Sequence, residues 1–299
     1  MRPKLGVWYR AIRPFSLSAA IVPVVVGNTL ALQYGAFDWL LLLLMLLGSL
    51  LVQCGTNLID EYADHAGERA EGKMLAPYKV IALGQLTPRD VRRGALVCFG
   101  VATLIGIYLV LRTGWPLALV CLASLGVAYG YSAGPRPLGN LGLGEPLVFL
   151  FMGPVMVLSS FYVQVHALSW PAVWLSLPIG SLVTAILVVN NLRDVEEDQH
   201  TGKATLATMG GPQAAAWVFC GLLVVAFGSL VALVASSTGP RVWLVPCVVV
   251  PQGIAVARMV CQGRERAVLH QALRGTAQLH LRFGLLLAIA LSPMLSQLG

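Results

Sequence analysis

Long apolar runs separated by short polar segments dominate the chain. A helix that spans a membrane needs about 20 consecutive apolar residues, and about nine stretches of suitable length occur here. They lie at residues 15–34, 39–59, 93–112, 115–132, 146–165, 171–191, 213–236, 241–260 and 281–298. The pattern predicts an all-α, polytopic membrane protein in which these helices form one bundle. We expect residues 1–299 to make a single membrane-embedded domain.

The composition supports a membrane location. Hydrophobic residues make up 57% of the chain and charged residues only 11%, whereas a soluble globular protein carries about 25% charged residues. Such a chain cannot cover itself with a polar surface, so lipid must surround most of it. The six cysteines show no metal-ligand spacing and are interpreted as small hydrophobic side chains.

The positive charges indicate an orientation. If the N-terminus is cytoplasmic and the predicted helices alternate, all of the 20 lysines and arginines except Arg112 and Arg241 fall on the inner side. Cytoplasmic loops of membrane proteins carry such an excess of Lys and Arg. The net charge of +7 is therefore interpreted as a topology signal and not as a nucleic-acid footprint. The long polar loops share the inner side, where we expect the function to lie.

Acidic residues are concentrated in two short stretches that directly follow predicted helices. The chain has only 13 acidic residues, and most of them belong to the two groups Asp60, Glu61, Asp64, Glu68, Glu71 and Asp194, Glu196, Glu197, Asp198. Residues four apart share one face of a helix. The spacing predicts one stripe formed by Asn57, Asp60, Asp64 and Glu68, and a second formed by Asn190, Asp194 and Asp198.

Stacked like charges destabilise a helix, so the two stripes call for a compensating partner. Mg²⁺ is a candidate, because it binds a few carboxylates together with phosphate oxygens and water. Lysines and arginines follow both stretches, and such cations stabilise the charge that builds up on a departing diphosphate. One stretch alone is equally compatible with a solvated helix end, but two stretches in matching register favour a metal and diphosphate site.

The two acidic patterns resemble those of the UbiA-type intramembrane prenyltransferases. The first reads Asp60-x-x-x-Asp64-x-x-x-Glu68 and the second Asp194-x-x-x-Asp198. Residues 13–27, 131–146 and 190–207 are similar to the branch that prenylates 1,4-dihydroxy-2-naphthoate in menaquinone biosynthesis. The chain departs from the family pattern at Asp60, where Asn is frequent, at Glu61, where the branch often has Asp, and at Glu68, which replaces an Asp. These departures leave the individual metal ligands open.

The resemblance implies an enzymatic reaction. A polyprenyl group would pass from its diphosphate to 1,4-dihydroxy-2-naphthoate, with Mg²⁺ as cofactor, and diphosphate and CO₂ would leave as a demethylated menaquinone forms. The implied catalytic residues are Asp60, Asp64, Asp194 and Asp198, and the same four together with Glu68 would bind metal. The substrate-binding residues would be Asn57, Lys79, Tyr131, Arg136, Asn190, Arg193 and Lys203. On pathway grounds, the expected location is a bacterial inner membrane, with the active site facing the cytoplasm.

Two alternatives remain open from the sequence. A sibling enzyme would use another acceptor, such as 4-hydroxybenzoate, homogentisate, a chlorophyllide or a lipid glycerol. An ion-coupled transporter would also place carboxylates on membrane helices, but near the middle of the bilayer. The acidic stretches lie instead at predicted helix ends, and residues 15–34 and 146–165 carry no charge. This arrangement favours the enzyme.

Overall fold

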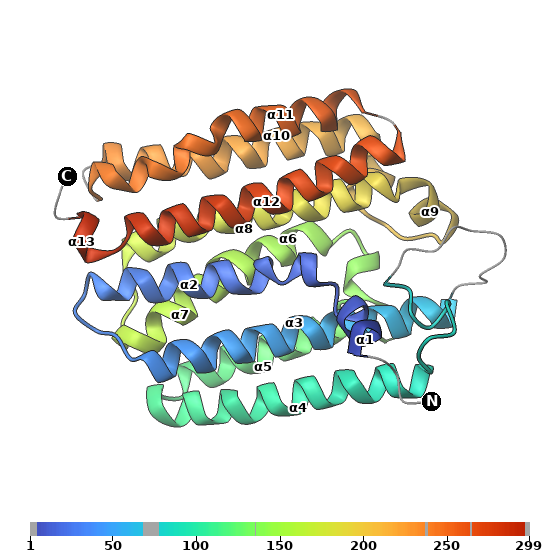
Figure 1. The fold of residues 1–299 in the computed structure, drawn as a ribbon, viewed down its shortest axis with the longest axis horizontal. Helices are drawn as coiled ribbons and strands as arrows, with labels where there is room; N and C mark the ends of the chain where they lie inside the picture. Colours follow the sequence, from blue (N-terminus) through green and yellow to red (C-terminus); the bar gives the residue numbers. More distant parts are fainter. Residues whose placement is uncertain (1–4, 68–77, 135, 237–238, 264, 297–299) are drawn as a thin grey trace. The chain divides into compact units, whose positions relative to one another are not determined.

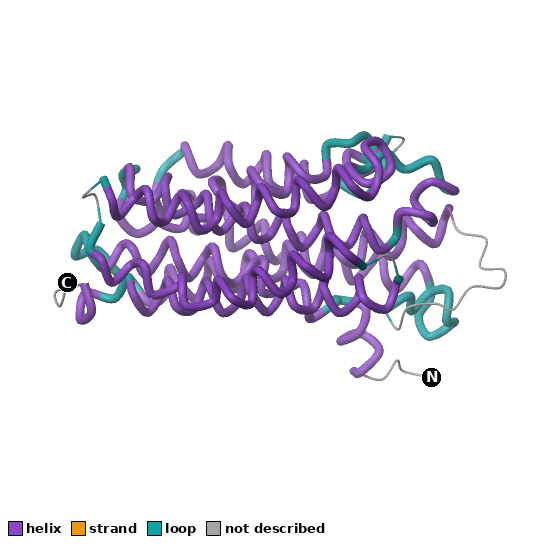
Figure 2. Tube along the Cα trace, turned by 90° about the horizontal axis from the view of Figure 1, so that it is seen from above, coloured by secondary structure: helices purple, strands orange, loops and turns teal. Residues whose placement is uncertain are grey.

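A computed structural model describes residues 5–67, 78–134, 136–236, 239–263 and 265–296. In these ranges the chain forms helices and loops, with no strand and one isolated bridge between Leu141 and Ala204 (Figures 1 and 2). The chain divides into two compact units. Unit 1 comprises residues 1–17 and 44–138, and unit 2 comprises residues 18–43 and 139–299.

Unit 1 is built on the long helix α3, which begins in unit 2 and continues through unit 1. The elements of unit 1 are α1 (Leu5–Ala11), the short helix η1 (Pro14–Ser16), α3 (Trp39–Gly67), α4 (Pro88–Thr113) and α5 (Pro116–Gly130). Helix α4 begins at Pro88, because Thr87 caps it by accepting a hydrogen bond from the backbone N–H of Asp90 and proline is favoured in a first helical turn. A small core around Leu58, Val80 and Val91 joins the C-terminal end of α3 and the N-terminal end of α4 to the loop between them.

Unit 2 is organised around α8 (Trp170–Arg193), the most completely buried of its long helices. Helix α8 packs against α10 and α12, which lie beside it in Figure 1. The remaining elements are α2 (Ser18–Leu32), η2 (Leu138–Asn140), α6 (Gly144–Leu150), the π-helical turn η3 (Phe151–Val155), α7 (Met156–Val165), α9 (Val195–His200), α10 (Leu206–Ala235), η4 (Arg241–Val249), α11 (Val250–Gln262), α12 (Arg266–Ala290) and α13 (Pro293–Ser296).

Two backbones in unit 2 approach each other closely at a pair of glycines. A Cβ atom added to Gly153 in η3 would lie 2.6 Å from the Cα atom of Gly180 in α8. A Cβ atom on Gly180 would in turn lie 2.8 Å from the carbonyl oxygen of Phe149. Small residues let membrane helices pack at this distance, so both positions exclude any larger side chain.

Seven helical segments in the described residues are long and apolar enough to cross a membrane. They are Pro14–Leu32, Trp39–His65, Pro88–Thr113, Gly144–Val165, Trp170–Arg193, Leu206–Ala235 and Arg241–Gln262, and α5 is a shorter apolar helix. These helices correspond to the first eight predicted ranges, so the all-helical membrane fold is confirmed. The total of about nine helices and the cytoplasmic N-terminus stay predictions.

The last predicted helix differs from the observed one. The apolar run predicts a helix over 281–298, whereas α12 begins at Arg266 and ends at Ala290. Its first half is amphipathic, since Leu269, Ala272, Leu273 and Thr276 are buried at helical spacing, whereas the polar residues His270, Gln271, Arg274 and Gln278 are exposed. The predicted inner loop therefore contains part of a helix that an unbroken apolar run does not reveal.

Candidate functional site

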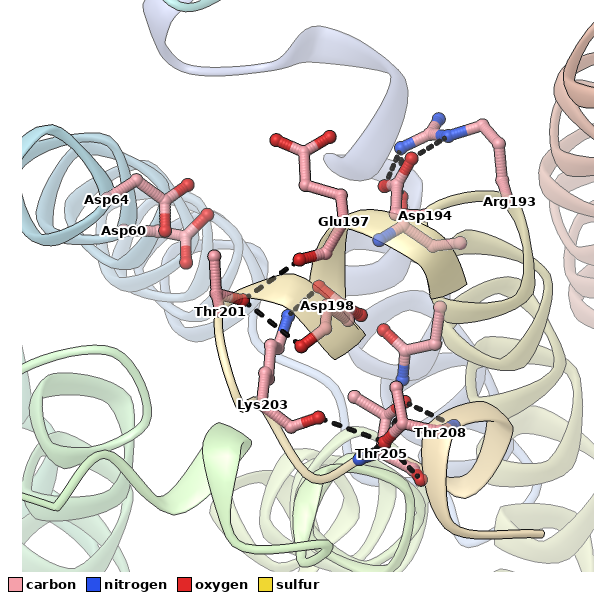
Figure 3. Close-up of polar contacts among 12 residues, drawn as sticks. Asp60, Asp64, Arg193, Asp194, Glu197, Asp198, Thr201, Lys203, Thr205 and Thr208 are labelled. Carbon is pink, nitrogen blue, oxygen red and sulfur yellow. Dashed lines mark hydrogen bonds and ion pairs between the residues drawn. The ribbon is translucent and has the colours of Figure 1, made fainter. Parts of the chain in front are cut away.

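The first acidic stretch lies at the end of α3. Asp60 and Asp64 are one turn apart and both are labelled on this helix in Figure 3. Asp60 forms an ion pair with Arg13 at 2.5 Å and accepts a hydrogen bond from the hydroxyl of Ser132 at 2.8 Å. Asp64 forms an ion pair with Lys79 at 2.5 Å. Each carboxylate thus has its own cation within unit 1. The predicted ligand Glu68 lies outside the described residues.

Arg13 is a site residue that the sequence analysis missed. Its backbone adopts a left-handed conformation with φ of 52°, which is uncommon and costly for a residue with a side chain. The guanidinium lies 4.5 Å from the ring centre of Tyr78. Burial lowers the pKa of Arg13, but Asp60, Tyr78 and Asp64 raise it more, so the net pKa lies above its ordinary value. A permanent positive charge therefore faces Asp60.

Asn57 fastens the N-terminal segment to α3. Its buried side-chain nitrogen donates hydrogen bonds to the carbonyl oxygen of Ile12 at 2.7 Å and to the hydroxyl of Ser16 at 2.9 Å. The amide nitrogen is thus occupied within the protein. The predicted substrate contact of Asn57 stays a prediction, and the structure gives this residue a separate role in holding the segment that carries Arg13.

Replacing Asn57 with leucine is expected to loosen residues 12–16. The loss of two hydrogen bonds at a buried position should lower the free energy of unfolding by about 1–3 kcal/mol. Thermal unfolding in detergent and amide hydrogen exchange of the segment would measure this effect. A matched control is Thr103→Val, which removes an exposed bond to Phe99 within α4. Unchanged exchange with a loss of diphosphate binding would instead favour the substrate contact.

The second acidic stretch does not continue α8 as one helix. Helix α8 ends at Arg193. Asp194 leaves the helical conformation and is the N-cap residue of α9. The predicted unbroken helical face through Asn190, Asp194 and Asp198 is therefore wrong. A new helix start explains the difference, because carboxylates in a first turn interact favourably with the positive end of the helix dipole. The backbone N–H of Asp198 still donates to the carbonyl oxygen of Asp194 at 2.9 Å.

Cations also accompany the second stretch. Arg193 binds Asp194 with two nitrogens, at 2.8 Å from Nε and 2.5 Å from Nη2, and also donates to the side-chain oxygen of Asn190 at 3.0 Å. Arg266, which the sequence analysis did not single out, lies 3.3 Å from Asp194. Lys203 lies 3.5 Å from Asp198 (Figure 3). Three basic residues thus neutralise the two aspartates within unit 2.

Asp198 has an unused ligand atom. The residue is only 7% exposed, and its Oδ2 atom is buried with no hydrogen-bond partner. Burial raises the pKa of Asp198 above its ordinary value, while Lys203 acts in the opposite direction. A buried carboxylate oxygen without a partner is costly, and a bound cation would remove this cost.

The donor set fits a divalent cation that is bound together with phosphate. In the described part of the chain, no three His, Cys, Asp or Glu side chains gather around a common metal position. Mg²⁺ does not require such a cage, because it commonly binds one or two carboxylates and completes its shell with phosphate oxygens and water. The paired aspartates and the free oxygen of Asp198 match this requirement.

Two predicted substrate-binding residues follow α5. Tyr131 is the half-buried residue at the end of this helix, and Arg136 is exposed in the loop beyond it. Ser132, between them, makes the contact with Asp60 that the sequence analysis did not anticipate. The sequence signal that could have pointed to Ser132 is its place within residues 131–146, one of the stretches that resemble the family. The roles of Tyr131 and Arg136 stay predictions.

Comparison with known proteins identifies the class. The model of the UbiA prenyltransferase family matches residues 20–282. The chain is 33% identical over 285 residues to a 1,4-dihydroxy-2-naphthoate octaprenyltransferase of Bacillus subtilis, covering 95% of this chain and 92% of that protein. It is also 33% identical over 290 residues to the Mycobacterium tuberculosis protein of the same name, covering 95% and 96%.

Solved structures share the fold. A UbiA homolog from Aeropyrum pernix superimposes with a TM-score of 0.68 at 14% identity and covers 97% of this chain and 98% of its own. A UbiA homolog from Archaeoglobus fulgidus, bound to DMAPP and Mg²⁺, superimposes with a TM-score of 0.60 at 14% identity, covering 94% and 99%. The fold and the relatives together define a multi-pass membrane enzyme that transfers prenyl groups. The chain belongs to the UbiA prenyltransferase family, as the acidic patterns predicted.

Proposed function

We propose that this enzyme transfers a polyprenyl group from polyprenyl diphosphate to 1,4-dihydroxy-2-naphthoate in a Mg²⁺-dependent reaction. The two relatives with that acceptor in their names match nearly the whole chain. The observation that carries the proposal is the repeated arrangement of the acidic stretches. Each presents two aspartates four residues apart, and each aspartate lies against a lysine or arginine. Carboxylates with exchangeable cationic partners suit a metal-bound diphosphate.

In this proposal the two aspartates of each acidic stretch hold a cation, and the basic residues hold the phosphates. Asp60, Asp64, Asp194 and Asp198 bind Mg²⁺, and Glu68 is a further proposed ligand. When bound, Mg²⁺ supplies positive charge to the phosphate oxygens on which negative charge develops. Lys79 and Lys203 then exchange their aspartate partners for phosphate oxygens. Arg13 and Arg193 keep their aspartates correctly oriented, and Asn190 supports Arg193.

Prenylation and decarboxylation of the naphthoate, as proposed, need no oxidant or reductant. The bond between the prenyl carbon and the diphosphate oxygen breaks, and the ring carbon that bears the carboxylate forms a bond to that prenyl carbon. The bond to the carboxylate then breaks, CO₂ leaves, and the product is demethylmenaquinol. The apolar membrane interior keeps water from the allylic centre. Tyr131 is proposed to lie against the aromatic acceptor, and Arg136 to attract its carboxylate or the diphosphate.

The proposal is tested with the purified enzyme in lipid nanodiscs. Radiolabelled polyprenyl diphosphate is supplied with 1,4-dihydroxy-2-naphthoate labelled in its carboxylate, with Mg²⁺ or with EDTA. We expect a prenylated naphthoquinol and labelled CO₂ in equal amounts, and neither product after chelation. Turnover with 4-hydroxybenzoate or homogentisate alone would keep the prenyl transfer and refute the acceptor. Undiminished turnover in EDTA would refute the metal requirement.

The proposed location is the bacterial inner membrane, with the acidic stretches facing the cytoplasm. The excess of Lys and Arg in the segments that contain these stretches supports this orientation. Single cysteines introduced at Arg136 and at Arg241, in a chain whose six native cysteines are replaced, would respond differently to a membrane-impermeant maleimide added to intact cells. Labelling at position 241 alone is the expected result, and the reverse pattern would contradict the orientation.

A further inference from the structure

Two buried glutamates, one within the first acidic stretch and one in α6, have no part in the roles described so far. Glu61 is 1% exposed and Glu145 is 8% exposed. Burying a carboxylate is costly unless it is hydrogen-bonded or paired, so each position requires an explanation. Each side chain accepts a hydrogen bond from a backbone N–H that lies within three residues of a lysine.

Glu61 ties the loop that carries Lys79 to α3. Its Oε1 atom accepts a hydrogen bond from the backbone N–H of Ile81 at 3.0 Å. Ile81 belongs to a compact turn in which the N–H of Leu83 donates to the carbonyl oxygen of Lys79 at 3.0 Å. The turn closes at Gly84, whose φ is +66°. Glu61 therefore fixes the backbone of the turn to the helix that bears Asp64, the partner of Lys79.

Glu145 makes the corresponding attachment in unit 2. Its Oε1 atom accepts hydrogen bonds from the side-chain nitrogen of Asn191 at 2.9 Å and from the backbone N–H of Leu206 at 3.2 Å. Asn191 in α8 precedes the second acidic stretch and Leu206, the first residue of α10, follows it. One carboxylate therefore joins the two ends of residues 192–205, which include α9 and Lys203. Two backbone bonds of Ala204, with Gly142 at 2.9 Å and with Asn140 at 3.1 Å, reinforce this attachment.

Fixing the backbone matters because a lysine side chain is long and flexible. Its ammonium group samples a wide region unless the backbone that carries it is held in place. Lys79 stands two positions before Ile81, and Lys203 stands three positions before Leu206. In both units, the backbone N–H that binds the glutamate is thus close in sequence to the lysine that faces an aspartate.

We propose that Glu61 and Glu145 are positioning residues of prenyl transfer, which hold Lys79 against Asp64 and Lys203 against Asp198. The inference rests on the proposed diphosphate-binding role of these lysines. Each glutamate acts through the loop backbone and does not contact substrate or metal. A glutamine at either position keeps the acceptor oxygen, whereas an alanine removes it.

The first experiment measures KM for polyprenyl diphosphate in Glu61→Ala, Glu145→Ala and the two glutamine variants. Loss of a residue that holds a ligand-binding side chain in place typically weakens binding about 10- to 100-fold. We expect a rise in KM of this size for the alanine variants. The glutamine variants should stay close to the parent. Glu196→Ala, at an exposed position on α9, is the matched control and should have no effect.

The second experiment is a double-mutant cycle. If Glu61 acts through Lys79, adding Glu61→Ala to Lys79→Ala should raise KM no further, and the same holds for Glu145 with Lys203. Additive effects on KM would overturn the proposal. So would a glutamine variant that raises KM while the loop stays protected, because the negative charge itself would then be required.

Amide hydrogen exchange gives a readout that needs no turnover. The N–H groups of Ile81 and Leu206 should exchange faster in the alanine variants and at the parental rate in the glutamine variants. Faster exchange with unchanged KM would show a purely structural role and overturn the proposal. If the parent enzyme binds polyprenyl diphosphate but does not prenylate the naphthoate, the proposed acceptor is wrong. Equilibrium binding of the diphosphate to the variants then still tests the positioning roles of Glu61 and Glu145. If an alanine variant does not fold, the glutamine variant decides.

Discussion

Replacing Asp64 or Asp194 with alanine is expected to reduce the rate of prenyl transfer about a thousandfold or more. Each substitution removes a proposed metal ligand and also the ion pairs that this aspartate makes. Lys79 loses its ion pair with Asp64 in the first case, and Arg193 and Arg266 lose their ion pairs with Asp194 in the second. Single-turnover measurements with radiolabelled polyprenyl diphosphate, across a range of Mg²⁺ concentrations, would determine the loss.

The controls separate the metal site from the general charge of the loops. Glu196→Ala removes an acidic residue from α9 at an exposed position and should leave the rate unchanged. Asp64→Asn and Asp194→Asn keep the shape of the side chain and should still fail, because an amide is a poor substitute for a carboxylate ligand. A variant of either aspartate with the parental rate at saturating Mg²⁺ would exclude that stretch from the diphosphate site.

Replacing Gly153 with valine is expected to prevent unit 2 from folding stably. A Cβ atom at this position would lie 2.6 Å from the Cα atom of Gly180, and the obstruction is backbone that cannot rotate away. Overpacking in cores typically costs about 1–3 kcal/mol, and here three methyl-sized groups would have to separate η3 from α8. We expect little monodisperse protein after detergent extraction and a strongly lowered melting temperature.

The matched control for this substitution is Gly221→Ala in α10. Nothing lies within 4 Å of a Cβ atom added there. Because alanine favours a helix over glycine by about 0.5–1 kcal/mol, the control should match or exceed the parent in stability. Equal yields and melting temperatures for Gly153→Val and the parent would contradict the close approach of η3 and α8.

The membrane fold was largely predictable because its signals are local. Apolar length alone located α3, α8 and α10, and the step of four residues placed Asp60 and Asp64 on one face of α3. The same step did not distinguish one helix from two at Asp194. A single non-helical residue preserves the spacing of charges in the sequence while it ends α8 and starts α9.

The cationic partners were only partly predictable, for a different reason. Lys79, Arg193 and Lys203 lie near the acidic stretches in the sequence, and their proximity suggested a shared site. Arg13, Ser132 and Arg266 reach the aspartates only through tertiary packing, and no local pattern indicates such a contact. The roles of Glu61 and Glu145 were hidden in the same way, because their hydrogen-bond partners, Ile81, Leu206 and the side chain of Asn191, reach them only through tertiary packing.

The π-helical turn between α6 and α7 has a consequence for variation in length among relatives. A π turn accommodates one residue more than the α-helical turn that it interrupts. Deleting one residue within Phe151–Val155 would restore regular helix and leave α6 and α7 facing their present neighbours. Deleting a residue from α8 would instead rotate everything beyond it by about 100°, since each residue of an α-helix turns by 360°/3.6. Insertions and deletions within these spans should therefore be concentrated at this turn.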